Sequence, residues 1–212
     1  MSVVRKMEVF IVRHGETAFN LGEERIRGRV DVPLSEIGLK HADEVGEALS
    51  NIAIDTIYYS KLSRAKETAA GIKKYQKEAS FKEEPFLLDI SFGEWEGKKG
   101  SEVFHGDLKH KWANMPNDVL IPGGETFYQV LDRIHRLFLR LREQQEQNVV
   151  LVSHGAVINL LFVYITQTHP SRYWDFYVKP CSISHIRLHP NGRTNIVKFN
   201  DIHHLSQDKS NG

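Results

Sequence analysis

Two histidines in this chain follow apolar runs, and each is itself followed by a glycine. Residues 9–12 lead into Arg13-His14-Gly15, and residues 149–152 lead into Ser153-His154-Gly155. An imidazole changes its protonation near neutral pH, so it can serve as a nucleophile, base or hydrogen-bond donor. Arginine carries a permanent positive charge that suits oxyanions. The two imidazoles and the arginine therefore indicate a site for anion chemistry.

The apolar runs indicate where these histidines lie in the fold. Four consecutive apolar residues rich in β-branched types are typical of a strand buried on both faces of a parallel sheet. Glycine lets the chain turn sharply away from the strand end. Ligands of open α/β sheets bind beyond the carboxyl ends of the strands. We therefore expect both histidines at one edge of one sheet.

The rest of the chain alternates between strand-like and helix-like segments, which is typical of a parallel sheet covered by helices. The pattern predicts an α/β fold, a three-layer αβα sandwich with a mostly parallel sheet. The expected strands lie near residues 8–12, 56–59, 85–88 and 149–153, with a hairpin at 183–188 and 194–199. The expected helices cover about 36–50, 62–77, 125–147 and 156–165, and Ser35 caps the first of them.

Length and composition limit the classes of protein that fit. At 212 residues the chain suits one domain over 1–212, and its net charge of +1 argues against nucleic-acid or membrane-surface partners. A single cysteine, Cys181, excludes an intramolecular disulfide and suits a reducing compartment. No apolar run approaches the ~20 residues of a membrane span. We expect a cytoplasmic protein in which Cys181 is a buried structural thiol.

Two further segments place reactive side chains near the same edge. The strand at 56–59 leads into Ser60 and then Arg64, in the first turn of the following helix. Asp89 ends another expected strand and precedes the run Phe92-Gly93-Glu94-Trp95-Glu96-Gly97. A guanidinium and a carboxylate are thus added to the two imidazoles.

With these motifs in this order, the chain resembles the histidine phosphatase superfamily, whose fold is called phosphoglycerate mutase-like. The resemblance covers about residues 8 to 205. It rests on four motifs: Arg13-His14-Gly15-Glu16-Thr17, Ser60-x-x-x-Arg64-Ala65-x-x-Thr68, Phe92-Gly93-x-Trp95-Glu96-Gly97 and Ser153-His154-Gly155. A lone Arg-His-Gly would be weak, whereas the four together are specific.

The resemblance implies a role for each charged group. His14 would be the nucleophile and form a phosphohistidine, which requires an unprotonated nitrogen. Arg13 and Arg64 would bind the phosphate oxygens, and His154 would be a protonated or donating partner of the transferring group. These fixed cations would take over the charge neutralisation that a metal ion performs elsewhere, so we expect no metal and no cofactor.

The resemblance also implies further substrate contacts and a proton donor. Asn20 and Gly155 are expected at the phosphate. The superfamily usually has a glutamate where this chain has Asp89, which keeps the carboxyl but shortens its reach. Asp89 is our candidate for the general acid that protonates the leaving group and later activates water. Glu94 and Glu96 remain local alternatives.

The segment between Asp89 and His154 is shorter than in the cofactor-dependent mutases that the chain resembles. A more open site admits water to a phosphohistidine, whereas a mutase must exclude it. We therefore expect a phosphomonoester hydrolase that acts on a small phosphorylated metabolite and releases inorganic phosphate. The alternatives are mutase-type phosphoryl transfer, a catalytically weak phosphate-binding regulatory protein, and a hydrolase with a metal held by His14, His154 and Asp89.

Specificity is expected to come from a cap-like insertion at about 98–124. Its lysines, Lys98, Lys99, Lys109 and Lys111, would either favour a second anionic group or form a solvated surface, and the solvated surface is favoured. The run 122–125, Pro-Gly-Gly-Glu, resembles a motif of the superfamily's small phosphatases, including α-ribazole phosphatase-like and broad-specificity members. The sequence leaves open the substrate and whether the protein forms a homodimer.

Overall fold

The computed structural model describes residues 6–20 and 25–206. Within these residues, six strands form one sheet in the order β3-β2-β4-β1-β5-β6. Neighbours among β1 to β4 pair in parallel, and β5 and β6 join antiparallel beside β1. The strands are β1 (Met7–Arg13), β2 (Thr56–Tyr59), β3 (Ser80–Glu83), β4 (Asn148–Ser153), β5 (Ile183–Leu188) and β6 (Thr194–Asp201).

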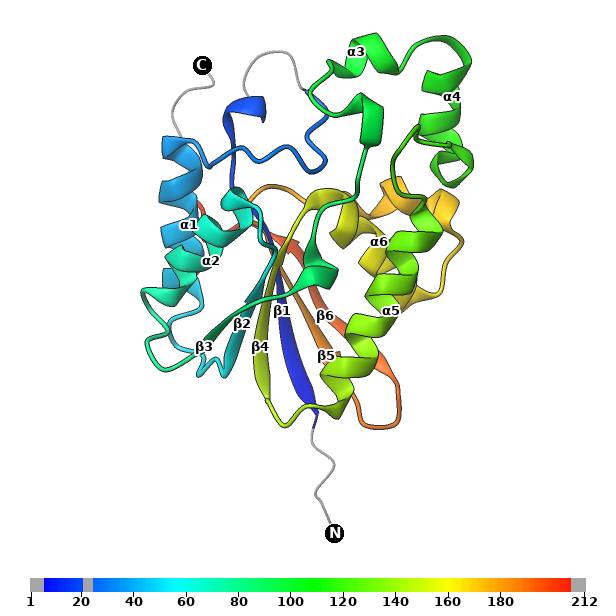
Figure 1. Cartoon of the computed structure of the whole chain (residues 1–212). Helices are drawn as coiled ribbons and strands as arrows, with labels where there is room; N and C mark the ends of the chain where they lie inside the picture. The colour runs from blue at the N-terminus through cyan, green and yellow to red at the C-terminus, as the bar shows by residue number, and fades with distance from the viewer. Residues whose placement is uncertain (1–5, 21–24, 207–212) are drawn as a thin grey trace.

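Long helices cover both faces of this sheet (Figure 1). One side carries α1 (Glu36–Ala48) and α2 (Ser63–Lys73), and the other carries α5 (Phe127–Glu143) and α6 (Gly155–Thr166). This is the predicted three-layer αβα arrangement with a mostly parallel sheet, so the predicted fold class is confirmed. No helix among the described residues combines the length and apolar character needed to cross a membrane.

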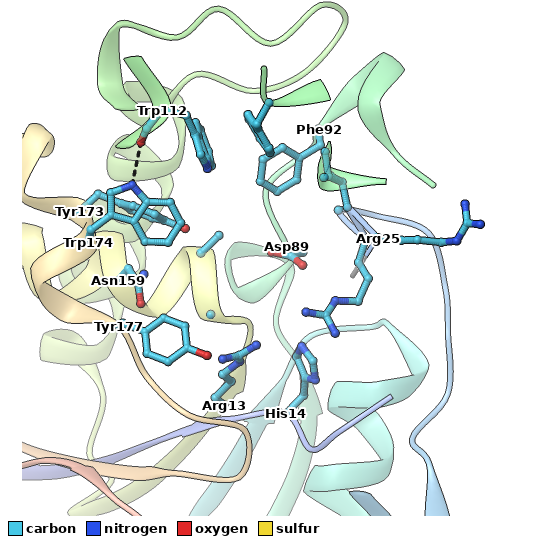
Figure 2. A pocket seen from close by; sticks show the side chains of 17 residues that line it. Arg13, His14, Arg25, Asp89, Phe92, Trp112, Asn159, Tyr173, Trp174 and Tyr177 are labelled. Carbon is cyan, nitrogen blue, oxygen red and sulfur yellow. Dashed lines mark hydrogen bonds between the residues drawn. The ribbon is translucent and has the colours of Figure 1, made fainter. Parts of the chain in front are cut away.

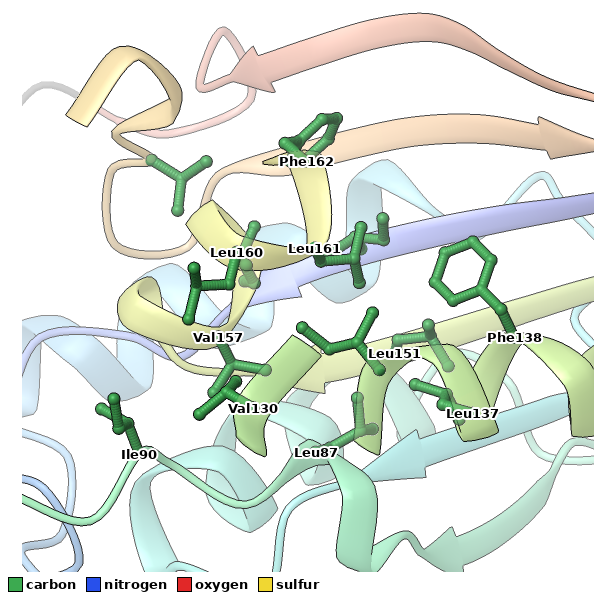
Figure 3. Packing of buried hydrophobic residues seen from close by; sticks show 14 of the residues in the cluster. Leu87, Ile90, Val130, Leu137, Phe138, Leu151, Val157, Leu160, Leu161 and Phe162 are labelled. Atoms are coloured by element: carbon green, nitrogen blue, oxygen red, sulfur yellow. The ribbon is translucent and has the colours of Figure 1, made fainter. Parts of the chain in front are cut away.

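The apolar runs form strands because they can be buried on both sides. In β1, Val9 and Ile11 join the core beneath α5 and α6, while Phe10 and Val12 join the core beneath α1 and α2. Successive strand side chains point to opposite faces, so an unbroken apolar run fills two cores. Figure 3 shows Leu151 of β4 surrounded by residues from α5 and α6. Full burial of one such side chain is worth about 1.5–3 kcal/mol.

The prediction of a strand at residues 85–88 is wrong. Pro85–Leu87 forms a 3₁₀ turn, in which the Glu84 side chain accepts a hydrogen bond from the Phe86 N–H. Proline has no N–H for a strand ladder but suits the first turn of a helix. The strand there is β3, a parallel edge partner of β2 whose side chains are mostly exposed, so it lacks an apolar pattern.

The expected cap-like segment, residues 98–124, contains two short helices, α3 (Gly100–Val103) and α4 (Gly106–Asn114). They lie beyond the carboxyl ends of the parallel strands, at the top of Figure 1. The Trp174 indole Nε1 donates to the Trp112 carbonyl at 2.7 Å, which ties α4 to a 3₁₀ helix over Pro170–Phe176. The assignment of residues 98–124 as a cap on a single domain stays a prediction.

Candidate active site

The strand register brings the two histidines together. Arg13 of β1 lies opposite Ser153 of β4, so His14 and His154 leave adjacent strand ends. Their ring centroids are 5.1 Å apart, and their side chains are almost completely buried. The expectation that both imidazoles meet at one edge of the sheet agrees with this geometry.

The turn after His14 is held from both sides. A Cβ on Gly15 would come within 2.8 Å of the Gly38 carbonyl oxygen, so only glycine fits this close approach to α1. The Gly15 N–H donates to Thr68 Oγ1 at 3.0 Å, and that hydroxyl donates to the Arg64 carbonyl at 2.7 Å. The turn is therefore fixed to α1 and α2, which positions the imidazole of His14.

Hydrogen bonding selects one tautomer of His14. Its Nδ1 lies 2.7 Å from the Gly15 carbonyl oxygen, which can only accept, so Nδ1 carries the proton. Burial lowers the pKa of His14 well below 6.5, and repulsion from a protonated His154 and from the charges of Arg64 and Arg13 would oppose its protonation further. His14 is therefore neutral near pH 7 and has a free lone pair on Nε2.

His154 is held in the opposite tautomer. Arg64 Nε donates to its Nδ1 at 3.2 Å, so Nε2 carries the proton and donates to Ser60 Oγ at 2.8 Å. Burial, followed by the charge of Arg64, lowers the pKa of His154 well below 6.5. His154 is therefore neutral and donates to Ser60, and its expected role as a partner of the transferring group stays a prediction.

Arg64 lies behind the cavity wall. Its side chain is fully buried, and Nη2 donates to Asp89 Oδ2 at 3.0 Å and to the Gly28 carbonyl at 2.7 Å. Nη1 donates to the Val30 carbonyl at 2.9 Å. Arg64 thus positions Asp89 and His154, and its expected contact with phosphate stays a prediction.

Of the three candidates for the proton donor, Asp89 is the one whose carboxylate lines the cavity. Its Oδ1 accepts from the Ile90 N–H at 2.9 Å, and its Oδ2 lies 3.5 Å from His154 Nδ1. Glu96 accepts instead from the backbone N–H groups of Phe92 and Arg29. Neither it nor the exposed Glu94 lines the cavity. The geometry favours Asp89 as the acid.

Arg13 has an unsatisfied donor at the cavity. Nη1 donates to the Val178 carbonyl at 2.5 Å, whereas Nε is buried and has no partner. A buried donor without a partner is costly, and an anion in the cavity would supply one. Gly155 gives it room, because a Cβ there would lie 3.2 Å from Arg13 Cζ. Gly155 also begins α6, whose positive helix end faces the cavity.

Two arginines on the cavity wall were missed by the sequence analysis. Arg27 donates from Nη1 to Thr17 Oγ1 at 3.2 Å, and its charge contributes to the lowered pKa values of both histidines. Arg25 donates to the Gly97 carbonyl at 2.8 Å. The alternation Arg25-Ile26-Arg27 just after the first motif was the available signal. The side chain of Asn20 lies outside the described residues.

A cavity of about 310 Å³ is lined by Arg13, His14, Arg25, Arg27, Asp89 and Gly155, whereas Arg64 and His154 are not among its lining residues. Figure 2 shows Arg13 and His14 at one end, Asp89 above them, and aromatic side chains toward the other end. The lysines at 98, 99, 109 and 111 do not line it, which agrees with the solvated alternative. No cluster of three or more potential metal ligands occurs among the residues that the structure describes.

The fold and the paired strand-end histidines define an α/β protein with a cation-rich cavity at the carboxyl edge of its sheet. The family model described as histidine phosphatase superfamily (branch 1) matches residues 9–202. The chain therefore belongs to the histidine phosphatase superfamily, and the predicted resemblance is confirmed.

Named relatives cover most of the chain. Phosphoserine phosphatase 1 of Hydrogenobacter thermophilus is 30% identical, with 95% of each chain covered. A metal-independent phosphoserine phosphatase of Arabidopsis thaliana is 32% identical, covering 94% of this chain and 83% of its own. A probable phosphoglycerate mutase, GpmB, of Salmonella choleraesuis is 31% identical over 85% and 84% of the two chains.

A solved structure with the same fold is that of Bacillus stearothermophilus YhfR. It is 27% identical, with a TM-score of 0.86, and the match covers 94% of this chain and 100% of that one. The relatives and structures found give a homodimer no support.

Replacing Arg13 with lysine should weaken competitive inhibition by inorganic phosphate by about 10–100-fold, because a lysine cannot reproduce the guanidinium's paired, directed donors. The inhibition constant against p-nitrophenyl phosphate measures this effect. Arg136→Lys is the matched control, since Arg136 is an exposed residue of α5 paired with Asp132. An inhibition constant that is unchanged in the Arg13 variant would remove Arg13 from the anion site.

Proposed function

We propose that this protein is a metal-independent phosphomonoester hydrolase that acts through a phosphohistidine on small phosphorylated metabolites. One observation carries the proposal: His14 lines a cation-rich cavity as a neutral imidazole with its Nε2 lone pair free. The phosphatase names of the two relatives that are 30% and 32% identical support it.

The reaction would have two steps. The substrate binds Arg13 and Arg27 as the phosphate monoanion, His14 Nε2 bonds to phosphorus, and the ester P–O bond breaks while Asp89 passes the proton of the phosphate to the leaving oxygen. Water then attacks the phosphohistidine, Asp89 takes a proton from the water and returns it to the departing phosphate, and His14 and inorganic phosphate are released. Fixed cations stabilise the charge that spreads over the phosphoryl oxygens in each transition state.

Solvent access favours hydrolysis over mutase-type transfer. Trp174 and Tyr177 on the cavity wall are 39% and 53% exposed, so this wall is open to water. A mutase must keep water from its phosphoenzyme until the phosphoryl group returns to substrate. The regulatory alternative is disfavoured because a nucleophile, fixed cations and an acid all meet at one cavity.

Chelator-treated protein should hydrolyse p-nitrophenyl phosphate at an unchanged rate, because arginines rather than a metal neutralise the phosphate. Quenching with alkali during turnover should trap an acid-labile phosphoprotein, and mass spectrometry should place its phosphate on His14. Loss of activity that only a divalent cation restores would instead support the metal-dependent alternative. Faster phosphoryl transfer to phosphoglycerate than to water would support a mutase.

A further inference from the structure

Aromatic side chains line much of the cavity, from its far end to the neighbourhood of Arg13. We call this set the aromatic wall; it consists of Phe92, Phe104, Trp112, Tyr173, Trp174 and Tyr177. Figure 2 shows Trp112 beside Trp174 and Tyr173, with Phe92 near them, at the end of the cavity away from His14, whereas Tyr177 lies beside Arg13.

Contacts between the rings give the aromatic wall a defined shape. The Phe104 ring stacks on Trp112 with centroids 4.9 Å apart, and Trp112 meets Trp174 edge to face at 5.8 Å. The hydrogen bond from Trp174 to the Trp112 carbonyl links the 3₁₀ helix over Pro170–Phe176 to α4. The wall is therefore built before any ligand arrives, and a flat ligand finds preformed apolar surface.

Two members of the wall leave much of their ring surface uncovered. Trp174 and Tyr177 are large aromatic residues that are exposed and line a cavity at the same time. Grouped exposed aromatic surface on a protein marks a binding site more often than solitary exposed rings do. An apolar group held there would gain about 25 cal/mol for each Å² that it removes from water.

The charges of the cavity select against a cationic substrate group. Arg13, Arg25 and Arg27 line it, and the carboxylate on its wall, Asp89, is already paired with Arg64. The Tyr177 ring, which could otherwise attract a cation, has the Arg13 guanidinium 5.8 Å from its centre. Among the residues that the structure describes on the cavity wall, an ammonium group, such as that of an amino acid phosphate, would meet positive charge and no unpaired carboxylate.

We propose, on the basis of the phosphatase function above, that the preferred substrate is a monophosphate ester of an alcohol that carries a flat aromatic or heteroaromatic ring and no cationic group. The ring binds the aromatic wall while the phosphate binds Arg13 beside His14. The cavity of about 310 Å³ suits a phosphate with a one- or two-ring group.

The first test compares esters whose leaving groups have similar basicity. 2-Naphthylmethyl phosphate, glycerol phosphate, phosphoserine and phosphocholine all release a primary alkoxide, so their kcat/KM values differ mainly through binding. We expect 2-naphthylmethyl phosphate to exceed the other three by about 100-fold in kcat/KM. Equal or higher values for phosphoserine or phosphocholine would overturn the inference and leave the phosphatase function standing.

Variants of the wall connect this preference to its residues. Tyr177→Ala should reduce the ratio of kcat/KM for naphthylmethyl phosphate over glycerol phosphate about 10-fold, and Trp112→Leu should do the same. Tyr128→Ala is the control, because Tyr128 is as exposed as Tyr177 but lies on α5 outside the cavity. Trp112 packs against several rings, so the exposed Tyr177 keeps the test decisive if the Trp112 variant fails to fold. An unchanged ratio in Tyr177→Ala would overturn the inference.

A binding measurement separates this inference from catalysis. 2-Naphthylmethylphosphonate cannot be hydrolysed, and its binding should change the fluorescence of Trp112 and Trp174. It should bind about 100-fold more tightly than methylphosphonate, and this advantage should fall in Tyr177→Ala. Tight binding without turnover of any ester would contradict the phosphatase function alone, whereas equal affinities of the two phosphonates would contradict the aromatic-wall inference alone.

Discussion

The His14→Ala protein should lose phosphomonoester hydrolysis by about 10⁴-fold or more, because covalent catalysis cannot begin without its nucleophile. The loss should be the same for activated and unactivated esters, since both pass through the same phosphohistidine. Turnover of p-nitrophenyl phosphate and of an alkyl phosphate measures it. The fold should be retained, because His14 lies beyond the end of β1 and outside both apolar cores.

His135→Ala serves as the matched control for this loss. His135 lies on α5, where its Nδ1 is 3.0 Å from the Tyr164 hydroxyl, and it does not line the cavity. The control should keep activity within a factor of about two, since it removes an imidazole that touches no reacting group. Activity of a folded His14→Ala protein within tenfold of the unsubstituted protein would exclude His14 as the nucleophile.

The meeting of His14 and His154 could be predicted from the sequence because it depends on strong local signals. The apolar runs of β1 and β4 are buried on both faces, so both strands lie in the centre of the sheet. Parallel neighbours end at the same edge, which places the residues that follow them together. The ring separation of 5.1 Å follows from the register of Arg13 with Ser153.

Weaker sequence signals explain the errors in the predicted secondary structure. β3 reads Ser-Phe-Lys-Glu and lies at an exposed edge, so burial imposes no apolar pattern on it. The apolar residues after Pro85 looked more like a strand, but Leu87 is buried from a 3₁₀ turn. Its carbonyl accepts a hydrogen bond from Ser153 Oγ at 2.8 Å, a tertiary contact that no local pattern specifies.

The sequence also could not predict the direction in which long side chains point. The motif that contains Arg64 placed this residue correctly in the first turn of α2, but its guanidinium is surrounded by protein acceptors behind the cavity. Arg27, which the sequence analysis missed, lines the cavity instead. Residues of the aromatic wall come from separate segments between Phe92 and Tyr177, and only folding brings them together. Such sites depend on tertiary packing rather than on spacing.

Asp89→Asn should lower kcat/KM for alkyl phosphates by about 10²–10⁴-fold, but for p-nitrophenyl phosphate by less than about tenfold. An alkoxide cannot leave without a proton, whereas nitrophenolate is a stable anion that can. Asparagine keeps the size of the side chain and an oxygen for the Ile90 N–H. The comparison uses kcat/KM because it reports formation of the phosphohistidine, before Asp89 acts as base toward water.

The second role of Asp89 provides an independent signature in the same variant. With p-nitrophenyl phosphate, phosphorylation of His14 stays fast while water attack is slowed, so the first turnover should appear as a burst of nitrophenolate before a slow steady rate. Glu94→Gln and Glu96→Gln should show neither the burst nor the selective loss, since both carboxylates lie off the cavity wall. If either glutamate variant showed them and Asp89→Asn did not, the proton donor would be that glutamate.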